Sequence, residues 1–366
     1  MDKKNIINKD RVIFLDYAKA IGIFLVVLGH AICFLPKTNL GNSIFNIIYS
    51  FHMPLFFIIS GIIIAITTKK TNNIDLKYKY FNLFYRLMIP YFLWSILYIF
   101  IRIMNNPYHI KHYFCRTIIA IISGSGLAPL WFLFSLFVSE VCFFYILKKW
   151  IIKSNSKIKR LILLLLIITL LSILCNYVYK ILLLHKIGNF YVSFIISFFR
   201  FILSMFFIVF GYIVGFLYDY SWLYKKKLLF GISLISGALC LLLRYVTHNF
   251  VNMHLFAFDN IFVFLLTGVL GSISVITFCM LINKDIKILS NIGRRTLDIM
   301  VLHYEPLPFM HYAIVITNIF SLKSSFFVVS ILTIVFTYFI SALFLEQSRF
   351  RINEFKLKQK IEDKWF

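Results

Sequence analysis

Long apolar runs alternate with short polar segments along the whole chain. Ten of these runs are long enough to cross about 30 Å of hydrocarbon as a helix that rises about 1.5 Å per residue. A further apolar stretch, residues 114–123, is too short to span and predicts a re-entrant or interfacial segment. The ten predicted spans are residues 12–35, 44–67, 83–104, 128–148, 161–184, 193–218, 228–246, 257–282, 296–319 and 325–346.

Basic residues gather in every second loop between these runs. Clusters precede the first run and follow the second, fourth, sixth, eighth and tenth runs, whereas the first and ninth loops carry only Lys37 and Lys323. The loop before residue 114 departs from this pattern, because it contains Lys111. Lysine and arginine accumulate in cytoplasmic loops of membrane proteins. The alternation therefore predicts a multi-pass protein of the plasma or inner membrane with both termini in the cytoplasm.

The composition supports a bilayer as the solvent. The chain is 61% hydrophobic and 14% charged, whereas a soluble domain is about 45–50% apolar and about 25% charged. The net charge of +24 lies in short clusters between apolar runs, which argues against nucleic acid as a partner. The six cysteines form no CxxC pair, so we expect neither a disulfide framework nor a zinc site.

These patterns predict one all-α domain over residues 1–366, a polytopic integral membrane helix bundle of about ten helices. Short tails at about residues 1–11 and 347–366 would flank it. The first run is longer than the apolar core of a signal peptide, so we expect it to remain as a span. No repeat of 20–50 residues is evident in the sequence.

The first span carries three ionisable groups on one helical stripe. Lys19 and His30 are eleven residues apart, and eleven steps of about 100° return to within about 20° of the start. Asp16 lies within about 40° of His30 on the same stripe. Ionisable groups in a span are costly and usually face the bundle interior. The stripe indicates either a functional site or a structural ion pair, Asp16 with Lys19, beside an interfacial histidine.

Other polar residues in the early spans each have two interpretations. His52, close to a proline in span two, is either a packing residue or a group that faces a cavity, and Gly61 permits close helix approach. Arg86 in span three either extends to the interface or binds an anionic ligand that enters from the cytoplasm. Glu140, deep in span four, needs a partner, for which Arg200 is one candidate.

Span nine contains two carboxylates and a histidine. Asp298 and Glu305 are seven residues apart and share a helical face. His303 would point elsewhere unless Pro306 or Pro308 distorts the helix. Asp298 is either charged and paired or protonated.

Five segments, in this order on the predicted spans, carry a family resemblance. They are LDYAKAIGIFLVVLGH, FHMPLFFIISG, YRLMIPYFLW, PLWFLFSLF and GRRTLDIMVLH. Together they resemble acyltransferase family 3, the membrane-bound O-acyltransferases, over most of the chain. The opening segment is especially similar to the fucose 4-O-acetylase-like branch. The family often has an Arg-x-x-Arg pair at the start of span three, where Arg86 matches the second member and Leu83 occupies the first.

The resemblance implies transfer of an acyl group, usually acetyl, from a coenzyme A thioester to a hydroxyl or an amine. The family's basic residue, ten-residue spacer and histidine match Lys19 and His30, so His30 is expected to act as general base or acylated nucleophile. Asp298 matches the acidic position before the span-nine histidine, and Asp16 or Asp298 would orient the imidazole. The expected substrate-binding residues are Lys19, Arg86, His52, Trp131, His303 and Glu305.

We therefore expect a membrane-embedded O-acetyltransferase, surrounded by lipids, that acts on cell-surface polysaccharide or on a lipid-linked glycan. Acetyl-CoA would be its acyl donor, and no metal is expected. One alternative is a transporter or exporter of a small molecule or lipid-linked sugar, which interior charges and proline-broken helices would also suit. Another is a sensor or a purely structural membrane protein. Acyl chemistry by the protein would separate the first interpretation from the other two.

Overall fold

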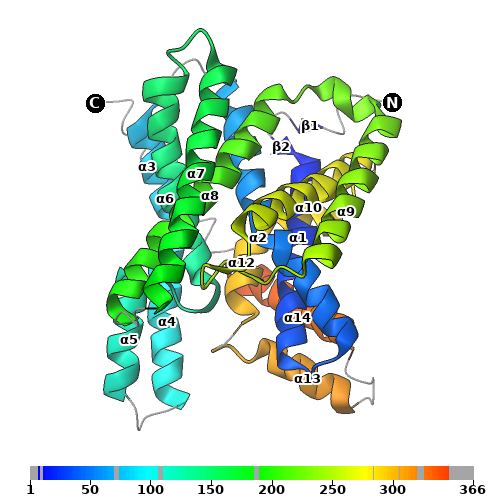
Figure 1. The fold of residues 1–366 in the computed structure, drawn as a ribbon. Coiled ribbons are helices and arrows are strands. Elements are labelled where there is room, and N and C mark those ends of the chain that lie inside the picture. The colour runs from blue at the N-terminus through cyan, green and yellow to red at the C-terminus, as the bar shows by residue number, and fades with distance from the viewer. Residues whose placement is uncertain are drawn as a thin grey trace, which may run out of the picture.

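Helices make up nearly all of the described chain in the computed structural model. The structure describes residues 7–8, 11–69, 74–105, 110–184, 189–282, 284–304, 306–319 and 325–345. Two short antiparallel pairs join β1 (Ile7–Asn8) to β2 (Arg11–Val12) and β3 (Val251–Asn252) to β4 (Ala257–Phe258). The α-helices are α1 Ile13–Phe34, α2 Asn39–Lys69, α3 Leu76–Leu83, α4 Ile89–Asn105, α5 Ile110–Ile122, α6 Trp131–Ile146, α7 Lys157–Leu184, α8 Asn189–Leu217, α9 Lys226–Thr247, α10 Ile261–Leu281, α11 Lys287–Arg294, α12 Thr296–Leu302, α13 Phe309–Ile319 and α14 Phe326–Ile340 (Figure 1).

Nine helical segments within the described residues are long and apolar enough to cross a bilayer. They correspond to the first eight predicted spans and to the last one. The third is composite, because α3, the π-helical turn η2 (Phe84–Met88) and α4 follow one another without a break. The chain is thus an all-α, multi-pass membrane bundle, as the sequence predicts.

The ninth predicted span, residues 296–319, is not one continuous helix. It divides into α12 and α13, which are seven and eleven residues long. Pro306 and Pro308 lie between them, and proline lacks the N–H that a continuing helix requires. The ninth of the predicted spans is therefore interrupted where the sequence allowed for a distortion by these prolines. His303 lies directly after α12, before the break.

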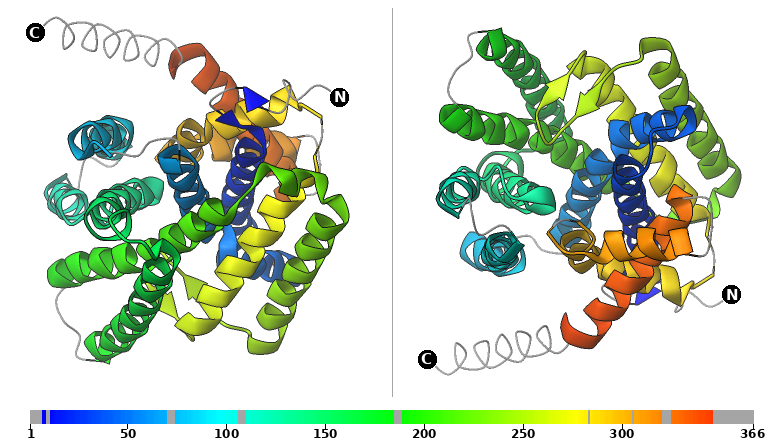
Figure 2. Two further views of the ribbon diagram at one scale, coloured as in Figure 1. Left: turned by 90° about the horizontal axis from the view of Figure 1, so that it is seen from above. Right: turned by 90° about the horizontal axis from the view of Figure 1, so that it is seen from below.

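The helices α1 and α2 lie in the middle of the bundle (Figure 2). Helix α2 packs against α8 and α10, and α1 packs against α2, α11 and α14. Where α2 meets α8, a Cβ on Gly61 would collide with the backbone of Ile208, and a Cβ on Gly211 would collide with the backbone of Ile58. The two backbones approach this closely because both positions lack a side chain. The predicted role of Gly61 in close helix approach is confirmed.

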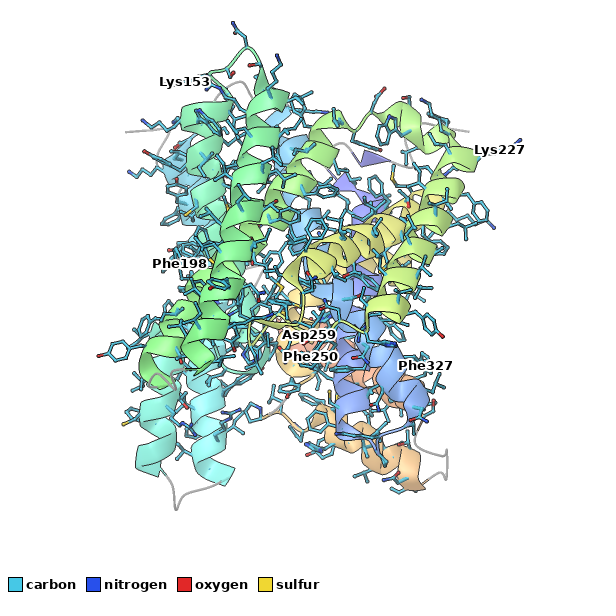
Figure 3. The ribbon with its side chains drawn as sticks, in the orientation of Figure 1. Lys153, Phe198, Lys227, Phe250, Asp259 and Phe327 are labelled. Atoms are coloured by element: carbon cyan, nitrogen blue, oxygen red, sulfur yellow. The ribbon has the colours of Figure 1, made fainter. Side chains whose placement is uncertain are left out.

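Charged and apolar side chains divide the surface of the bundle into an end and its flanks. Lys153, in the loop before α7, and Lys227, in the first turn of α9, lie at the same end, whereas Phe198 and Phe327 project from the flanks (Figure 3). Both phenylalanines are exposed, as expected for side chains that face lipid. We call the end that carries Lys153 and Lys227 the basic end.

Replacement of Gly61 by Ala is expected to loosen the contact between α2 and α8. The added methyl group has no room against a backbone that cannot rotate away, so we expect a loss of about 1–3 kcal/mol of stability. Thermal unfolding of the detergent-solubilised protein measures this loss. The matched control is Gly231→Ala in α9, where an added Cβ meets nothing within 4 Å. Equal unfolding temperatures for the two variants would contradict the packing argument.

Candidate active site

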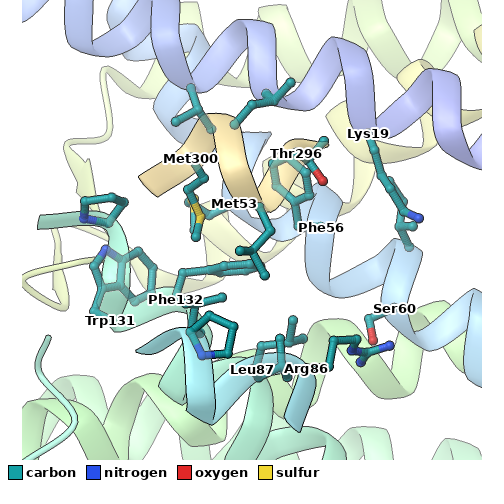
Figure 4. Close-up of a pocket in the computed structure, with 18 of the residues that line it drawn as sticks. Lys19, Met53, Phe56, Ser60, Arg86, Leu87, Trp131, Phe132, Thr296 and Met300 are labelled. Atoms are coloured by element: carbon teal, nitrogen blue, oxygen red, sulfur yellow. The ribbon is translucent and has the colours of Figure 1, made fainter. Parts of the chain in front are cut away.

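A cavity of about 1010 Å³ extends through the interior of the bundle. Its walls come from α1, α2, the segment from α3 to α4, α6, α12 and the hairpin formed by β3 and β4 (Figure 4). The exposed residues Thr67, Arg86 and Arg294 line it near the basic end. The exposed residue Cys33, in the last turn of α1, lines it at the other end. The cavity therefore includes exposed residues both near the basic end and in the last turn of α1.

Polar and apolar sections follow one another along this cavity. Lys19, Ser60 and Arg86 lie together on one side of the close-up, and Trp131 lies on the opposite side (Figure 4). Met53, Phe56, Phe132 and Met300 lie between them. We call these four residues the apolar waist.

Arg86 belongs to a cluster that joins three elements of the cavity wall. Its Nη2 donates to Oε2 of Glu140 at 2.7 Å, and the Ser60 hydroxyl donates to Oε1 of Glu140 at 2.5 Å. Arg86 lies in the π-helical turn η2, where the N–H of Ile89 reaches back to the carbonyl of Phe84 just before Pro90. Such turns interrupt regular helices and are frequent at functional sites. A basic side chain is thereby held at the cavity while Glu140 is buried.

Arg200, the candidate partner of Glu140, does not fill that role, because Arg86 forms the ion pair with Glu140. The guanidinium of Arg200 is buried and donates to the carbonyl of Ser125 and to the hydroxyl of Ser197. It also lies over the ring of Trp131, at 5.3 Å from the ring centroid. Arg200 thus stabilises the wall behind Trp131.

Lys19 and His30 both line the cavity, on the face of α1 that their spacing predicts. The Nζ of Lys19 lies 3.5 Å from Oδ1 of Asp16, so the predicted ion pair is present. Asp16 packs against Gly293 of α11, where a Cβ would collide with the Asp16 backbone. Asp16 precedes His30 by fourteen residues, about 21 Å along the helix. It therefore does not orient the His30 imidazole, and this part of the expectation was wrong.

The group that does contact the His30 imidazole is His303. The Nε2 of His303 lies 2.9 Å from Nδ1 of His30, and the two rings stack with 5.0 Å between their centroids and 23° between their planes. The Nδ1 of His303 is bonded to the carbonyl of Ile299 at 3.1 Å. His303 is fully buried and does not line the cavity. The end of α12 therefore places a second imidazole behind the first.

Asp298 lines the same cavity from α12, and its carboxylate is bound from behind. The hydroxyl of Ser341 donates to its Oδ2 at 2.7 Å, and Arg295 donates to that hydroxyl at 3.1 Å. The hydroxyl of Ser341 therefore links the carboxylate of Asp298 to the guanidinium of Arg295. The catalytic role of Asp298 stays a prediction.

His52 lines the cavity from α2. Its Nδ1 is 2.8 Å from the carbonyl of Ile48, which can only accept, so Nδ1 carries the proton. The other nitrogen of the neutral ring is then an acceptor. Within the described residues no hydrogen bond engages that nitrogen, so His52 can hold a donor group of a ligand but cannot donate to an anion.

Trp131 and His254 form the wall at the far side of the waist. The ring of His254 stacks on that of Trp131 with 5.7 Å between centroids. His254 belongs to the short segment between β3 and β4, where burial first and the charge of Arg200 second lower the pKa of its imidazole to about 4. His254 is therefore neutral near pH 7 and contributes a polar but uncharged surface to the cavity.

The structure brings together most of the residues that the sequence singles out. His30, Lys19, His52, Arg86, Trp131 and Asp298 line one cavity, and His303 lies directly behind His30. Glu305 and both predicted tails lie outside the described residues, apart from Ile7–Asn8 and Arg11.

Other cavity residues were not singled out by the sequence. Ser60 is a polar residue within an apolar run, directly before Gly61, so its hydroxyl was a signal that sequence reasoning could have used. Tyr304, whose ring lies 4.5 Å from that of His30, follows directly after a histidine that was singled out. His254 lies in the segment between β3 and β4, where no sequence pattern singles it out. Only the fold shows that it lines the cavity.

The comparisons with known proteins give one match. The sequence profile of the acyltransferase domain family, acyltransferase 3, matches residues 12–346, nearly the whole chain. No curated protein and no solved structure shows a significant match to the chain.

Among the described residues, no group of three or more histidine, cysteine, aspartate or glutamate side chains is placed to hold a metal ion.

The cluster of Arg86 and Glu140 is expected to be energetically coupled. Removal of either partner leaves the other without its ion-pair partner, so the single variants Arg86→Ala and Glu140→Ala should each destabilise the protein by about 1–3 kcal/mol. The double variant should cost less than the sum of the two by about 1 kcal/mol or more. Thermal unfolding in detergent of all four proteins completes the cycle. Strictly additive losses would show that the contact contributes nothing.

Proposed function

The chain belongs to the acyltransferase 3 family and is a multi-pass membrane acyltransferase; on this premise we propose that it is an O-acetyltransferase. It transfers an acetyl group from acetyl-CoA to a hydroxyl of a cell-surface polysaccharide or a lipid-linked glycan. The observation that carries this proposal is that the cavity joins the basic end of the bundle to the His30 imidazole. A donor and a base therefore meet inside the protein.

The donor enters at the basic end. Coenzyme A carries phosphates, which need cationic partners, and Lys79, Arg86 and Arg294 line this part of the cavity. The less polar pantetheine arm passes the apolar waist and places the thioester beside His30. Because acetyl-CoA is made in the cytoplasm, this direction of entry places the basic end on the cytoplasmic side of the plasma or inner membrane. The basic loops support the same orientation.

His30 then acts as the general base. The acceptor hydroxyl attacks the thioester carbonyl carbon while Nε2 of His30 takes the hydroxyl proton. The tetrahedral intermediate collapses, the carbon–sulfur bond breaks, and the departing thiolate takes the proton from His30. The products are the acetyl ester of the acceptor and coenzyme A, and His30 returns to its starting form. No other reactant is consumed.

The acceptor reaches His30 from the other end of the cavity. Cys33, Tyr49 and Tyr304 line this part and surround the approach to the imidazole. Aromatic rings with hydroxyl groups suit the alternating apolar and polar faces of sugars. The similarity of the first helix to the fucose 4-O-acetylase-like branch also favours a sugar hydroxyl. His52 can accept a hydrogen bond from a second acceptor hydroxyl, and Trp131 and Lys19 complete the substrate-binding walls.

Replacement of His30 by Ala is expected to lower acetyl transfer by about 10²–10⁴-fold, because the hydroxyl loses its proton acceptor. The measurement is the incorporation of alkali-labile acetate from labelled acetyl-CoA into the glycan and lipid fractions of membranes that contain the protein. Binding of coenzyme A to the purified variant should remain, which shows that the cavity is intact. Transfer at the wild-type rate would remove His30 from the mechanism. Substrate flux without any acyl transfer by the wild type would favour a transporter instead.

Replacement of Arg86 by Ala should weaken donor binding more than the chemical step. Loss of one charge-assisted contact to a phosphate corresponds to about a tenfold increase in KM for acetyl-CoA, with a smaller change in kcat. Arg86→Lys keeps the charge and should recover part of the loss. Arg102→Ala, on the same span but away from the cavity lining, is the matched control. Unchanged KM in Arg86→Ala would place the phosphates elsewhere.

A further inference from the structure

Behind His30 lies a second imidazole, that of His303, which was expected to bind substrate but is fully buried and does not line the cavity. We propose that His303 is a positioning residue: it fixes the proton of His30 on Nδ1 and so leaves Nε2 bare toward the cavity. This inference rests on the proposed role of His30 as the base. It assigns to an imidazole the place that a carboxylate usually holds in a base–orienter pair.

The backbone of α12 determines where His303 carries its own proton. The carbonyl of Ile299 accepts the backbone N–H of His303 at 3.0 Å and lies 3.1 Å from the Nδ1 of the same residue. A carbonyl oxygen has two lone pairs and cannot donate. Nδ1 of His303 must therefore be the donor, and Nε2 of the neutral ring is left as an acceptor.

The same reasoning then applies to His30. Its Nδ1 lies 2.9 Å from the Nε2 of His303, and a hydrogen bond at this distance needs one proton between the two nitrogens. Because Nε2 of His303 is bare, Nδ1 of His30 carries that proton. The Nε2 of His30 is then bare as well, on a ring that lines the cavity. With the opposite tautomers, the bare Nδ1 of His303 would face the lone pairs of the Ile299 carbonyl.

His303 itself is not placed to take the substrate proton. Both of its nitrogens are engaged, it is fully buried, and it is absent from the cavity lining. Its contribution acts through His30. When His30 gains a proton, the chain of hydrogen bonds lets the charge spread over two rings and toward the carbonyl of Ile299. The departing thiolate removes that proton, so neither ring changes its state over a full cycle.

The groups around the pair leave this role to His303. The imidazoles of His52 from α2 and His254 from the hairpin line the same cavity as His30, and Tyr304 lies against its ring. None of the carboxylates in the described part of the chain is hydrogen-bonded or ion-paired to His30 or His303. Asp298, on the helix that His303 directly follows, is bonded to Ser341.

Three substitutions separate positioning from packing. His303→Leu keeps the bulk but removes the acceptor, so we expect kcat to fall by about 30–100-fold while KM for acetyl-CoA stays within about twofold. His303→Gln supplies an amide oxygen as acceptor, and we expect it to recover at least about tenfold of this loss. His303→Glu places a carboxylate behind His30, which stabilises the imidazolium, and the acidic limb of the kcat–pH profile should move to higher pH.

Tyr98→Phe is the control for displacement of α12. The Tyr98 hydroxyl donates to the carbonyl of Val301 in α12 and does not touch either imidazole. We expect this variant to keep activity within about twofold. Equal losses in His303→Leu, His303→Gln and Tyr98→Phe would overturn the proposal, because they would indicate packing alone. Full activity of His303→Leu would overturn it too.

A spectroscopic measurement keeps this inference separate from the proposed function. In ¹⁵N-histidine-labelled protein, comparison of the wild-type spectrum with those of His30→Ala and His303→Leu assigns the ring nitrogen signals of His30 and of His303. Both rings should carry their proton on Nδ1 in the wild type, and the His30 ring should lose this preference in His303→Leu. A His30 ring protonated on Nε2 in the wild type would overturn the proposal even if acetyl transfer is observed. Failure of acetyl transfer together with the expected tautomers would instead refute the proposed function.

Discussion

The hydrogen bond between His30 and His303 joins the first helix of the bundle to the end of α12. In an unbroken helix His303 would point away from the face that carries Asp298. His303 keeps that direction, because its backbone angles are helical and its N–H bonds the carbonyl of Ile299, four residues earlier. The first helix of the bundle and the broken ninth span are thereby joined through His30, which lines the cavity, and His303, which lies behind it.

The cost of polar groups in hydrocarbon explains why the remaining polar residues lie where they do. An unpaired polar or charged group in a bilayer costs several kcal/mol, so each one must find a partner or face a wet space. Glu140 has two partners from other elements, and Asp298 has a serine. Arg200 has backbone and hydroxyl oxygens together with the ring of Trp131. These residues therefore line the cavity or lie directly behind its wall.

Much of this architecture follows from the sequence, because apolar length and basic loops constrain a membrane protein strongly. The spans, the shared face of Lys19 and His30, and the close approach at Gly61 were predictable on that basis. The interaction partner of each buried polar residue was not predictable, because helical periodicity gives the direction of a side chain but not the neighbouring helix. Glu140 could not be matched to Arg86 without knowing that α6 packs beside η2. The prolines signalled a break in span nine, but not that His303 would pack behind His30.

The apolar waist has a further consequence for the membrane itself. A wet passage that connects two surfaces of a membrane protein would let protons and ions leak and would dissipate the potential that the cell maintains. Met53, Phe56, Phe132 and Met300 interrupt the polar lining between its two ends (Figure 4). A hydrated ion would lose its polar contacts along this apolar section, whereas the thioester arm of the proposed donor can occupy it. On the proposed function, the same four side chains would therefore both admit the acyl group and oppose the passage of ions.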